Sequence, residues 1–260
     1  MLDRTGLGDS RARSGPAIMS PHSHRERWDS NMIQAVILAA GMGTRLGRPF
    51  PKPLTPLNDG RTIMEQQIDN LRQVFGADVR ITTVVGFKLD LILEAFPDVT
   101  YIYNEAYDQT NTNRSLLKAL RLSTEGGVLW MNGDVVFDPQ VLEKVSDLVE
   151  ADTSFICVDT AVVGDEEVKY TVDDDGYVDE LSKQVVNARG EAVGINFVSD
   201  SDKPTLIDRL SECSDADYFE RGIELAISHN SMRVIPVDIG EFFAVEVDFE
   251  EDLTRANEYL

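Results

Sequence analysis

The segment AVILAAGMGTRLGRPFPKPL at residues 35–54 constrains the fold of this chain more than any other part of its sequence. It begins as an apolar run typical of a buried strand, continues as a glycine loop and ends with the cations Arg45, Arg48 and Lys52. A glycine loop after a strand can present backbone N–H groups and cations to a polyphosphate. The segment therefore predicts a phosphate-binding loop at the end of a buried strand.

The spacing of this loop disfavours two common nucleotide-binding patterns. It contains no G-x-x-x-x-G-K-[ST] sequence, so it is not a P-loop. It also fails as a dinucleotide fingerprint, because the third glycine, Gly47, falls one position late and three prolines follow it. A dinucleotide-dependent oxidoreductase is therefore disfavoured, and an ordinary strand-to-loop turn with solvated cations remains the structural alternative.

Apolar runs alternate with helix-period stretches along the chain, which is typical of a parallel sheet with crossover helices. We expect strands at 35–39, 79–86, 99–104 and 126–134, and helices at 62–74, 89–96, 110–123 and 138–151. Short β-rich segments from residue 154 indicate antiparallel strands appended to the parallel core. Helices near 203–211, 217–229 and 249–259 follow. The expected fold class is α/β, with a Rossmann-like, mixed but mainly parallel sheet, flanking helices and a small β-rich insertion.

The charge of the chain limits its partners. A formal net charge of −22 predicts that neither nucleic acid nor an anionic membrane is a partner, because both would be repelled. No window of about 18 apolar residues occurs. The two cysteines, Cys157 and Cys213, match no metal or redox motif, and we expect free thiols in a reducing cytoplasm.

The first 31 residues differ in composition from the rest of the chain. They mix Arg, Ser, Gly and Pro without an apolar stretch, which argues against a secretory signal. We expect 1–31 to be a disordered or dispensable arm and 32–260 to form one domain.

Several motifs together resemble a known enzyme family. LAAGMGTRL followed by PFPKPL is similar to the signature of nucleotidyltransferases that join a nucleoside triphosphate to a sugar phosphate or a small phosphorylated alcohol. Later landmarks occur in the same order: NGDVVF at 132–137, ELSKQ at 180–184, GEAVGINF at 190–197 and AVEVDFEEDL at 244–253. The combination looks most like the cytidylyltransferase branch with phosphocholine cytidylyltransferases and their phosphonate-activating relatives. The resemblance implies a Rossmann-like fold in which the nucleotide lies over the loop.

The resemblance also implies a set of nucleotide-binding residues, namely Leu38, Ala39, Ala40, Gly41, Gly43, Thr44, Arg45, Lys52, Asn111 and Ser115. Within this set Arg45 would hold the β- and γ-phosphates. Lys52 would hold the α-phosphate, where negative charge increases in the transition state. Thr112 replaces the second Asn of the family's Thr-Asn-Asn pattern, which leaves the identity of the acceptor open. Asn111 could equally be a simple helix N-cap.

Three carboxylates are candidate ligands for Mg²⁺. Asp134 follows a buried strand, where α/β sheets place ligand-binding residues. Glu246 and Asp248 occupy alternate positions of a strand end, so they face the same side. Mg²⁺ binds through few carboxylates plus substrate oxygens, which fits this set. The alternatives are a turn-capping role for Asp134 and a capping box that begins at Asp248.

The resemblance assigns Lys183 and Glu191 to the acceptor, with Lys183 reaching its phosphate and the β-rich insertion forming its site. Arg45, Lys52 and Lys183 are then the catalytic cations. The expected activity is Mg²⁺-dependent transfer of CMP from CTP to a small phosphate or phosphonate acceptor, releasing pyrophosphate. A homodimer is the expected assembly. Two alternatives stay open: a UTP- or dTTP-dependent sugar-1-phosphate nucleotidylyltransferase, and a non-catalytic nucleotide-binding regulatory domain.

Overall fold

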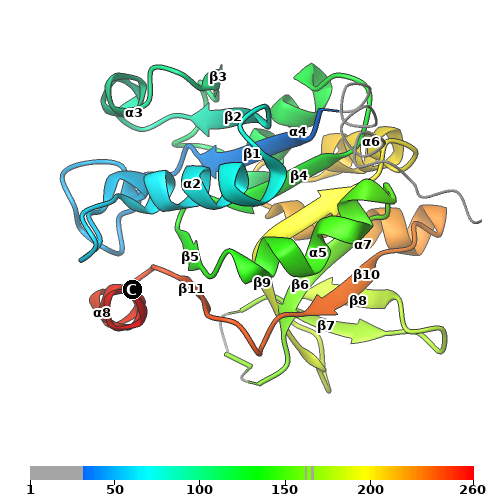
Figure 1. Ribbon diagram of the computed structural model, residues 1–260. Coiled ribbons are helices and arrows are strands. Elements are labelled where there is room, and N and C mark those ends of the chain that lie inside the picture. Colours follow the sequence, from blue (N-terminus) through cyan, green and yellow to red (C-terminus); the bar gives the residue numbers. More distant parts are fainter. Residues whose placement is uncertain (1–31, 162, 165–166) are drawn as a thin grey trace, which may run out of the picture. The chain divides into compact units, whose positions relative to one another are not determined.

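The computed structural model describes residues 32–161, 163–164 and 167–260, so the arm expected at 1–31 lies outside the described residues. Figure 1 shows a central sheet with helices on both faces. The helices are η1 (Lys52–Leu54, a 3₁₀ turn), α2 (Ile63–Phe75), α3 (Leu89–Ala95), α4 (Thr112–Leu122), α5 (Gln140–Glu150), α6 (Lys203–Glu212), α7 (Phe219–Asn230) and α8 (Glu250–Tyr259). The strands are β1 (Gln34–Ala39), β2 (Arg80–Val85), β3 (Thr100–Tyr103), β4 (Val128–Asn132), β5 (Val135–Phe137), β6 (Phe155–Asp159), β7 (Lys169–Val172), β8 (Val178–Ser182), β9 (Gly190–Val198), β10 (Ile235–Asp238) and β11 (Ala244–Glu246).

The main sheet is mixed. Its strand order is β10-β6-β9-β4-β1-β2-β3, and β7 and β8 lie off this path. β1 pairs in parallel with both β2 and β4, and β2 pairs in parallel with β3. β9 is antiparallel to its neighbours β4 and β6. The expected α/β class with a mainly parallel, Rossmann-like sheet is therefore confirmed.

The β-rich region after residue 154 differs from the expected appendage. β9 is nine residues long and lies between β4 and β6 inside the main sheet. β10 pairs with β6 in parallel. The β7–β8 hairpin joins the sheet off its main path, through the antiparallel pairing of β7 with β9. Its strands are short, whereas the nearly continuous burial of β9 is typical of a strand covered on both faces.

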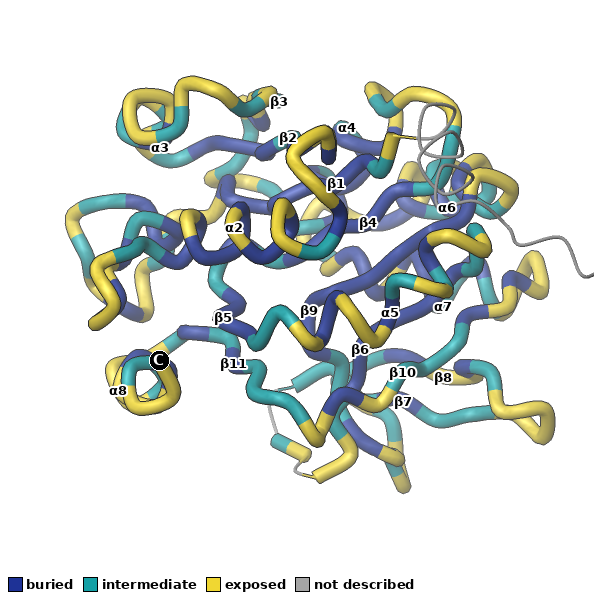
Figure 2. The backbone as a smooth tube through the Cα atoms, in the orientation of Figure 1, coloured by how far each residue is buried: buried dark blue, intermediate teal, exposed yellow. Residues whose placement is uncertain are grey.

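Side-chain alternation along β1 divides the core into two layers. Ala35, Ile37 and Ala39 join a cluster with α2 and α5, whereas Val36 and Leu38 join a cluster with α4, α6 and α7. This period of two is what a strand buried on both faces requires. Figure 2 shows the buried strands at the centre with the exposed surfaces of the helices outside them.

The helix boundaries follow the signals in the sequence. Thr62 caps α2 in a capping box, because its side chain accepts from the N–H of Glu65 and the Glu65 carboxylate accepts from the N–H of Thr62. Asp138 lies just before α5, and its Oδ1 accepts from the N–H of Gln140 at 2.8 Å. No helix among the described residues is long and apolar enough to cross a membrane.

A small second sheet was not anticipated as such. β5 and β11 pair antiparallel, with Glu246 opposite Val135. A third apolar cluster packs this sheet against α8, and Leu253 and Ala256 are its contributions from that helix. Because β5 follows β4 directly and pairs with β11, residue 134 and residues 246–248 lie in the same region.

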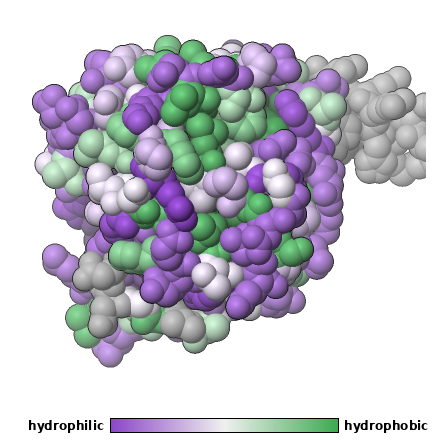
Figure 3. Space-filling view, turned by 90° about the vertical axis from the view of Figure 1, so that its left-hand side faces the viewer, coloured by the Kyte–Doolittle hydropathy of each residue, from purple (hydrophilic) through white to green (hydrophobic). Residues whose placement is uncertain are grey.

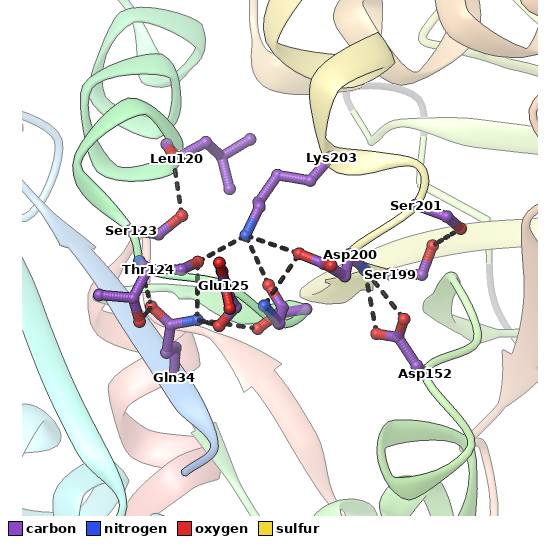
Figure 4. A network of polar contacts seen from close by, with 12 residues as sticks. Gln34, Leu120, Ser123, Thr124, Glu125, Asp152, Ser199, Asp200, Ser201 and Lys203 are labelled. Atoms are coloured by element: carbon purple, nitrogen blue, oxygen red, sulfur yellow. Dashed lines mark hydrogen bonds and ion pairs between the residues drawn. The ribbon is translucent and has the colours of Figure 1, made fainter. Parts of the chain in front are cut away.

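A polar network holds the N-terminal end of β1 (Figure 4). Gln34 accepts from the N–H of Thr124 at 2.8 Å and donates to the carbonyl of Glu125 at 3.1 Å. Lys203, at the start of α6, donates to the carbonyl of Thr124 at 2.7 Å and pairs with Asp200. These contacts join β1, the loop before β4 and α6, so the two central strands are held in register.

Candidate active site

A cleft of about 820 Å³ opens where β1 and β4 end. Figure 3 looks onto the side of the molecule at which β1 and β2 end, and there apolar residues gather in the upper middle with hydrophilic residues around them. Most of the predicted site residues line this cleft: Leu38, Ala39, Gly41, Gly43, Thr44, Arg45, Lys52, Asn111, Asp134, Lys183, Glu191, Glu246 and Asp248. The fold therefore brings together residues as far apart in the sequence as Leu38 and Asp248.

Two predicted nucleotide-binding residues do not line the cleft. Ser115 is buried in α4, where its hydroxyl accepts from the side chain of Asn104 at 3.1 Å. Ala40 is buried as well, and its carbonyl accepts from the N–H of Phe87 at 3.1 Å. Both residues lie behind the residues that line the cleft. Asn111 lines the cleft and is also the N-cap of α4. The helix cap is therefore present, and its nucleotide-binding role stays a prediction.

The glycine loop lies directly over η1. Gly43 has a φ of +58°, a conformation that favours glycine, and a Cβ there would lie 3.1 Å from the Cβ of Lys52. As the prolines indicate, no α-helix forms after the loop, and only the 3₁₀ turn Lys52–Leu54 follows. The close approach of loop and turn sets Lys52 in the floor of the cleft.

Lys52 joins two of the predicted metal carboxylates. Its Nζ lies 2.8 Å from Asp134 Oδ2 and 2.5 Å from Asp248 Oδ1, and the residue is 9% exposed. Burial alone would lower the pKa of Lys52, but the charges and hydrogen bonds of Asp134 and Asp248 outweigh burial and raise it. Lys52 is therefore a charged ammonium at neutral pH. Arg45 also pairs with Asp248, from the more exposed side of the cleft.

Glu246 is a buried carboxyl of the cleft whose pKa is strongly shifted. Its Oε1 accepts from Asn132 Nδ2 at 3.1 Å, and Gly194, at a φ of +66°, leaves the space that this pair occupies. Burial first, and then the nearby charge of Asp134, raise the pKa of Glu246 well above its ordinary range. A nearby cation would lower that pKa and favour the carboxylate.

The carboxylates Asp134 and Asp248 fit a divalent cation only when further ligands, such as phosphate oxygens, are added. Asp134 Oδ1 is buried and has no hydrogen-bond partner, so it is available to a cation. Among residues 32–161, 163–164 and 167–260, however, no three His, Cys, Asp or Glu side chains are grouped closely enough to hold a metal by themselves. Two carboxylates completed by phosphate oxygens are the usual Mg²⁺ arrangement, so Asp134 and Asp248 suit the ion once nucleotide is bound.

Lys183, Tyr218 and three further carboxyls also line the cleft. Lys183 Nζ lies 4.8 Å from the centre of the Tyr218 ring. The three carboxyls are Glu167, Glu191 and Glu220. Burial is the main cause that raises the pKa of each of these three carboxyls. Glu191 Oε2 accepts from the N–H of Gly164 at 2.8 Å.

Glu220 is a site residue that sequence reasoning missed. It lies in the first turn of α7, it is 8% exposed, and its Oε2 has no hydrogen-bond partner. Phe219 packs edge-on against Trp130 of β4 with ring centres 5.7 Å apart, which fixes the start of α7 at the cleft. Because α7 looks like an ordinary amphipathic helix, no local signal distinguishes Glu220. Asn132 was quoted within a motif, but its contact with Glu246 was not foreseen.

Glu220 should make stability depend on pH. Burial raises its pKa to about 7, with the Glu167 charge adding and Lys183 opposing. A raised carboxyl pKa stabilises the fold fully below the ordinary value near 4.5, and this stabilisation is lost as the pH rises through 7. We expect the stability of the wild type relative to Glu220→Gln to fall by about 3 kcal/mol between pH 4.5 and 8. Thermal melts of both proteins across this range measure it, and parallel curves would contradict it.

Comparisons with known proteins agree with this geometry. Residues 35–201 match the MobA-like NTP transferase domain family. Over 132 residues the chain is 37% identical to CMP-5'-(3-aminopropyl)phosphonate synthase from Streptomyces rubellomurinus, a match that covers 47% of this chain and 20% of that protein. The chain thus spans about a fifth of the length of that relative.

Solved structures share the fold over nearly the whole chain. CTP:phosphocholine cytidylyltransferase from Streptococcus pneumoniae superposes with a TM-score of 0.69 at 20% identity, over 88% of this chain and 99% of that one. A UDP-glucose pyrophosphorylase complexed with UDP-glucose has a TM-score of 0.69 at 14% identity, over 88% of this chain and 98% of that one. At these identities the likeness shows the nucleotidyltransferase fold and leaves the substrates undecided.

Proposed function

The chain belongs to the MobA-like NTP transferase family and is a nucleotidyltransferase, and from this premise we propose that it transfers CMP from CTP to a small amino-substituted phosphonate or phosphate. The reaction releases pyrophosphate and depends on Mg²⁺. The relative named for a CMP-aminopropylphosphonate product supports the cytidylyl group and the amino-substituted acceptor.

Four residues of the cleft, Lys183, Tyr218, Glu167 and Glu220, support this proposal, and we call them the acceptor end. Lys183 offers a cation for the phosphonate, while Glu167 and Glu220 offer carboxyls for an ammonium group. An ammonium group entering the cleft would pair with Glu220 Oε2, which has no hydrogen-bond partner among the described residues. A zwitterion therefore matches this end better than a sugar phosphate, which carries no ammonium group.

The chemistry needs no general base. A phosphate monoester has a second pKa near 6, so its oxygen is already ionised at neutral pH. In-line attack of an acceptor oxygen on the α-phosphorus of CTP forms the new P–O bond and expels pyrophosphate. Of the described residues that line the cleft, none is a histidine. Alignment and charge neutralisation are what the site must provide.

Each cation of the cleft is proposed to bind a different phosphate group. In our proposal Lys52 stabilises the charge that develops on the α-phosphate, and Arg45 holds the β- and γ-phosphates. Asp134 and Asp248 would hold Mg²⁺, which would supply charge neutralisation for the pyrophosphate leaving group. The Lys52 ammonium pairs with the same two carboxylates, so it lies beside the position proposed for the metal. Lys183 orients the acceptor oxygen.

A sugar-1-phosphate acceptor with UTP or dTTP is the second candidate. The fold shared with the UDP-glucose pyrophosphorylase favours it. The carboxyl-rich acceptor end argues against it, because a sugar would leave those groups without partners. A cytoplasmic location, a homodimer and a dispensable arm at 1–31 stay predictions beside both candidates.

A paired acceptor series tests the proposal. With CTP and Mg²⁺, we expect kcat/KM for 3-aminopropylphosphonate or 2-aminoethylphosphonate to exceed that for propyl- or ethylphosphonate about 100-fold, which corresponds to about 3 kcal/mol for a desolvated charge pair. Pyrophosphate release measures the rates. Glu220→Gln should reduce the ratio of kcat/KM between the aminoalkylphosphonate and the alkylphosphonate of each pair. Higher rates with UTP or dTTP and glucose 1-phosphate would establish the second candidate instead.

A further inference from the structure

Asp134 lies in a two-residue turn between β4 and β5. The turn is Gly133–Asp134, with Asn132 ending β4 on one side and Val135 beginning β5 on the other. The backbone of the turn is held by two hydrogen bonds: Gly133 N–H donates to the carbonyl of Leu38 at 2.9 Å, and Val247 N–H donates to the carbonyl of Asp134 at 2.9 Å. The direction of the Asp134 side chain therefore depends on how this turn is held.

A buried amide from α2 holds both sides of the turn. Gln67 Nε2 donates to the carbonyl of Asn132 at 2.8 Å and to the carbonyl of Val135 at 2.8 Å. These carbonyls belong to the residues on either side of Gly133–Asp134. Gln67 is 0% exposed, so the amide forms these bonds without competition from water.

Packing alone does not explain why a glutamine occupies the buried position 67. Gln67 Oε1 is buried and has no hydrogen-bond partner among the described residues. A buried polar atom without a partner destabilises the fold, and an apolar side chain of similar length would fill the space without that cost. The benefit of the glutamine must therefore come from its Nε2 group, and both hydrogens of that group act on the Asp134 turn.

We propose that Gln67 is a positioning residue for the nucleotidyl transfer, because its amide clamps the β4–β5 turn that presents Asp134 to Lys52 and to a nucleotide-bound divalent cation. This inference rests on the proposed role of Asp134. Gln67 does not line the cleft, so it acts through Asp134 and not on the substrate. Residues that orient a metal ligand typically change metal affinity or activity by roughly 10–100-fold when they are replaced.

The neighbouring residue provides a matched control. Gln66 is 2% exposed, its Oε1 also lacks a partner, and its Nε2 donates to the carbonyl of Phe137 at 2.6 Å. Phe137 is at the far end of β5, away from the Asp134 turn, and Asn70 donates to the same carbonyl. Gln66→Met thus removes a buried amide of the same kind from the same helix and strand without changing the turn.

The experiment compares Gln67→Met with Gln66→Met in the full chain. Binding of Mn²⁺ in the presence of CTP, followed by the electron paramagnetic resonance of free Mn²⁺, should weaken roughly 10–100-fold in Gln67→Met and less than about twofold in Gln66→Met. With an active acceptor, kcat should fall by a similar factor in Gln67→Met while KM for the acceptor stays within about twofold. Equal Mn²⁺ affinities for the two variants would overturn the inference.

Two cases need a further comparison: a variant that does not fold, and a wild type that turns over none of the acceptors. If Gln67→Met does not fold, the pair Gln67→Glu and Gln66→Glu replaces it, because Glu keeps the size of Gln but has at most one hydrogen to donate. The same ordering is then expected and the same equality would overturn the inference. If the wild type binds Mn²⁺–CTP but turns over none of the acceptors, the proposed function fails, and the Mn²⁺ affinities still decide the role of Gln67.

Discussion

Lys52→Ala is expected to leave a folded protein whose kcat is lower by at least about 100-fold, the usual loss when one preorganised donor to a developing charge is removed. The reason is its position: the ammonium sits on the floor of the cleft, paired with Asp134 and Asp248, and its pKa is raised by them. Pyrophosphate release under saturating CTP measures the change.

Lys203→Ala is the control for Lys52→Ala. Lys203 is 8% exposed, against 9% for Lys52, and it too makes hydrogen bonds, but with backbone carbonyls at the opposite end of β1 (Figure 4). Its removal should lower the melting temperature and leave kcat per folded molecule within about twofold of the wild type. If Lys52→Ala kept a rate similar to that of Lys203→Ala, Lys52 would be excluded from the transfer step.

The outline of the fold could be predicted because local signals and tertiary structure agree. The apolar run at 35–39 and the prolines after Gly47 each have a local physical consequence, and each is seen in the structure. The position of β9 inside the sheet could not be predicted in this way. Short β-rich segments have the same pattern whether they extend a sheet or form an appendage, since strand order depends on long-range pairing.

The same distinction applies to the site. The end of a buried strand and a glycine loop indicated Asp134 and Lys52, and the structure brings their side chains within 2.8 Å. Glu220 and Gln67 escaped prediction because their importance comes from burial, which an amphipathic helix pattern does not show for a single polar residue. Ser115 was assigned to the nucleotide by resemblance, yet Asn104 holds it inside the wall. Roles that depend on tertiary contacts need the structure.

Asp134→Asn is expected to have the second large effect, a loss of roughly 100–1,000-fold in kcat with little change in shape. The substitution removes the charge that Lys52 and a divalent cation share, while an amide keeps the size of the side chain. It also exchanges one carboxylate oxygen for an NH2 group, which cannot bind Mg²⁺, in a side chain whose buried Oδ1 has no hydrogen-bond partner among the described residues. The Mn²⁺ affinity in the presence of CTP should fall together with kcat.

Asp138→Asn separates this effect from a general disturbance of β5. Asp138 lies at the other end of the same strand, where its carboxylate accepts from the Gln140 N–H and from the Tyr259 hydroxyl. Burial, together with the bond to Asp138, raises the pKa of Tyr259 to about 12. Asp138→Asn should therefore lower the Tyr259 pKa in a spectrophotometric titration and leave kcat and Mn²⁺ affinity unchanged. If Asp134→Asn kept the Mn²⁺ affinity of the wild type, Asp134 could not be a metal ligand, and its pairing with Lys52 would be structural.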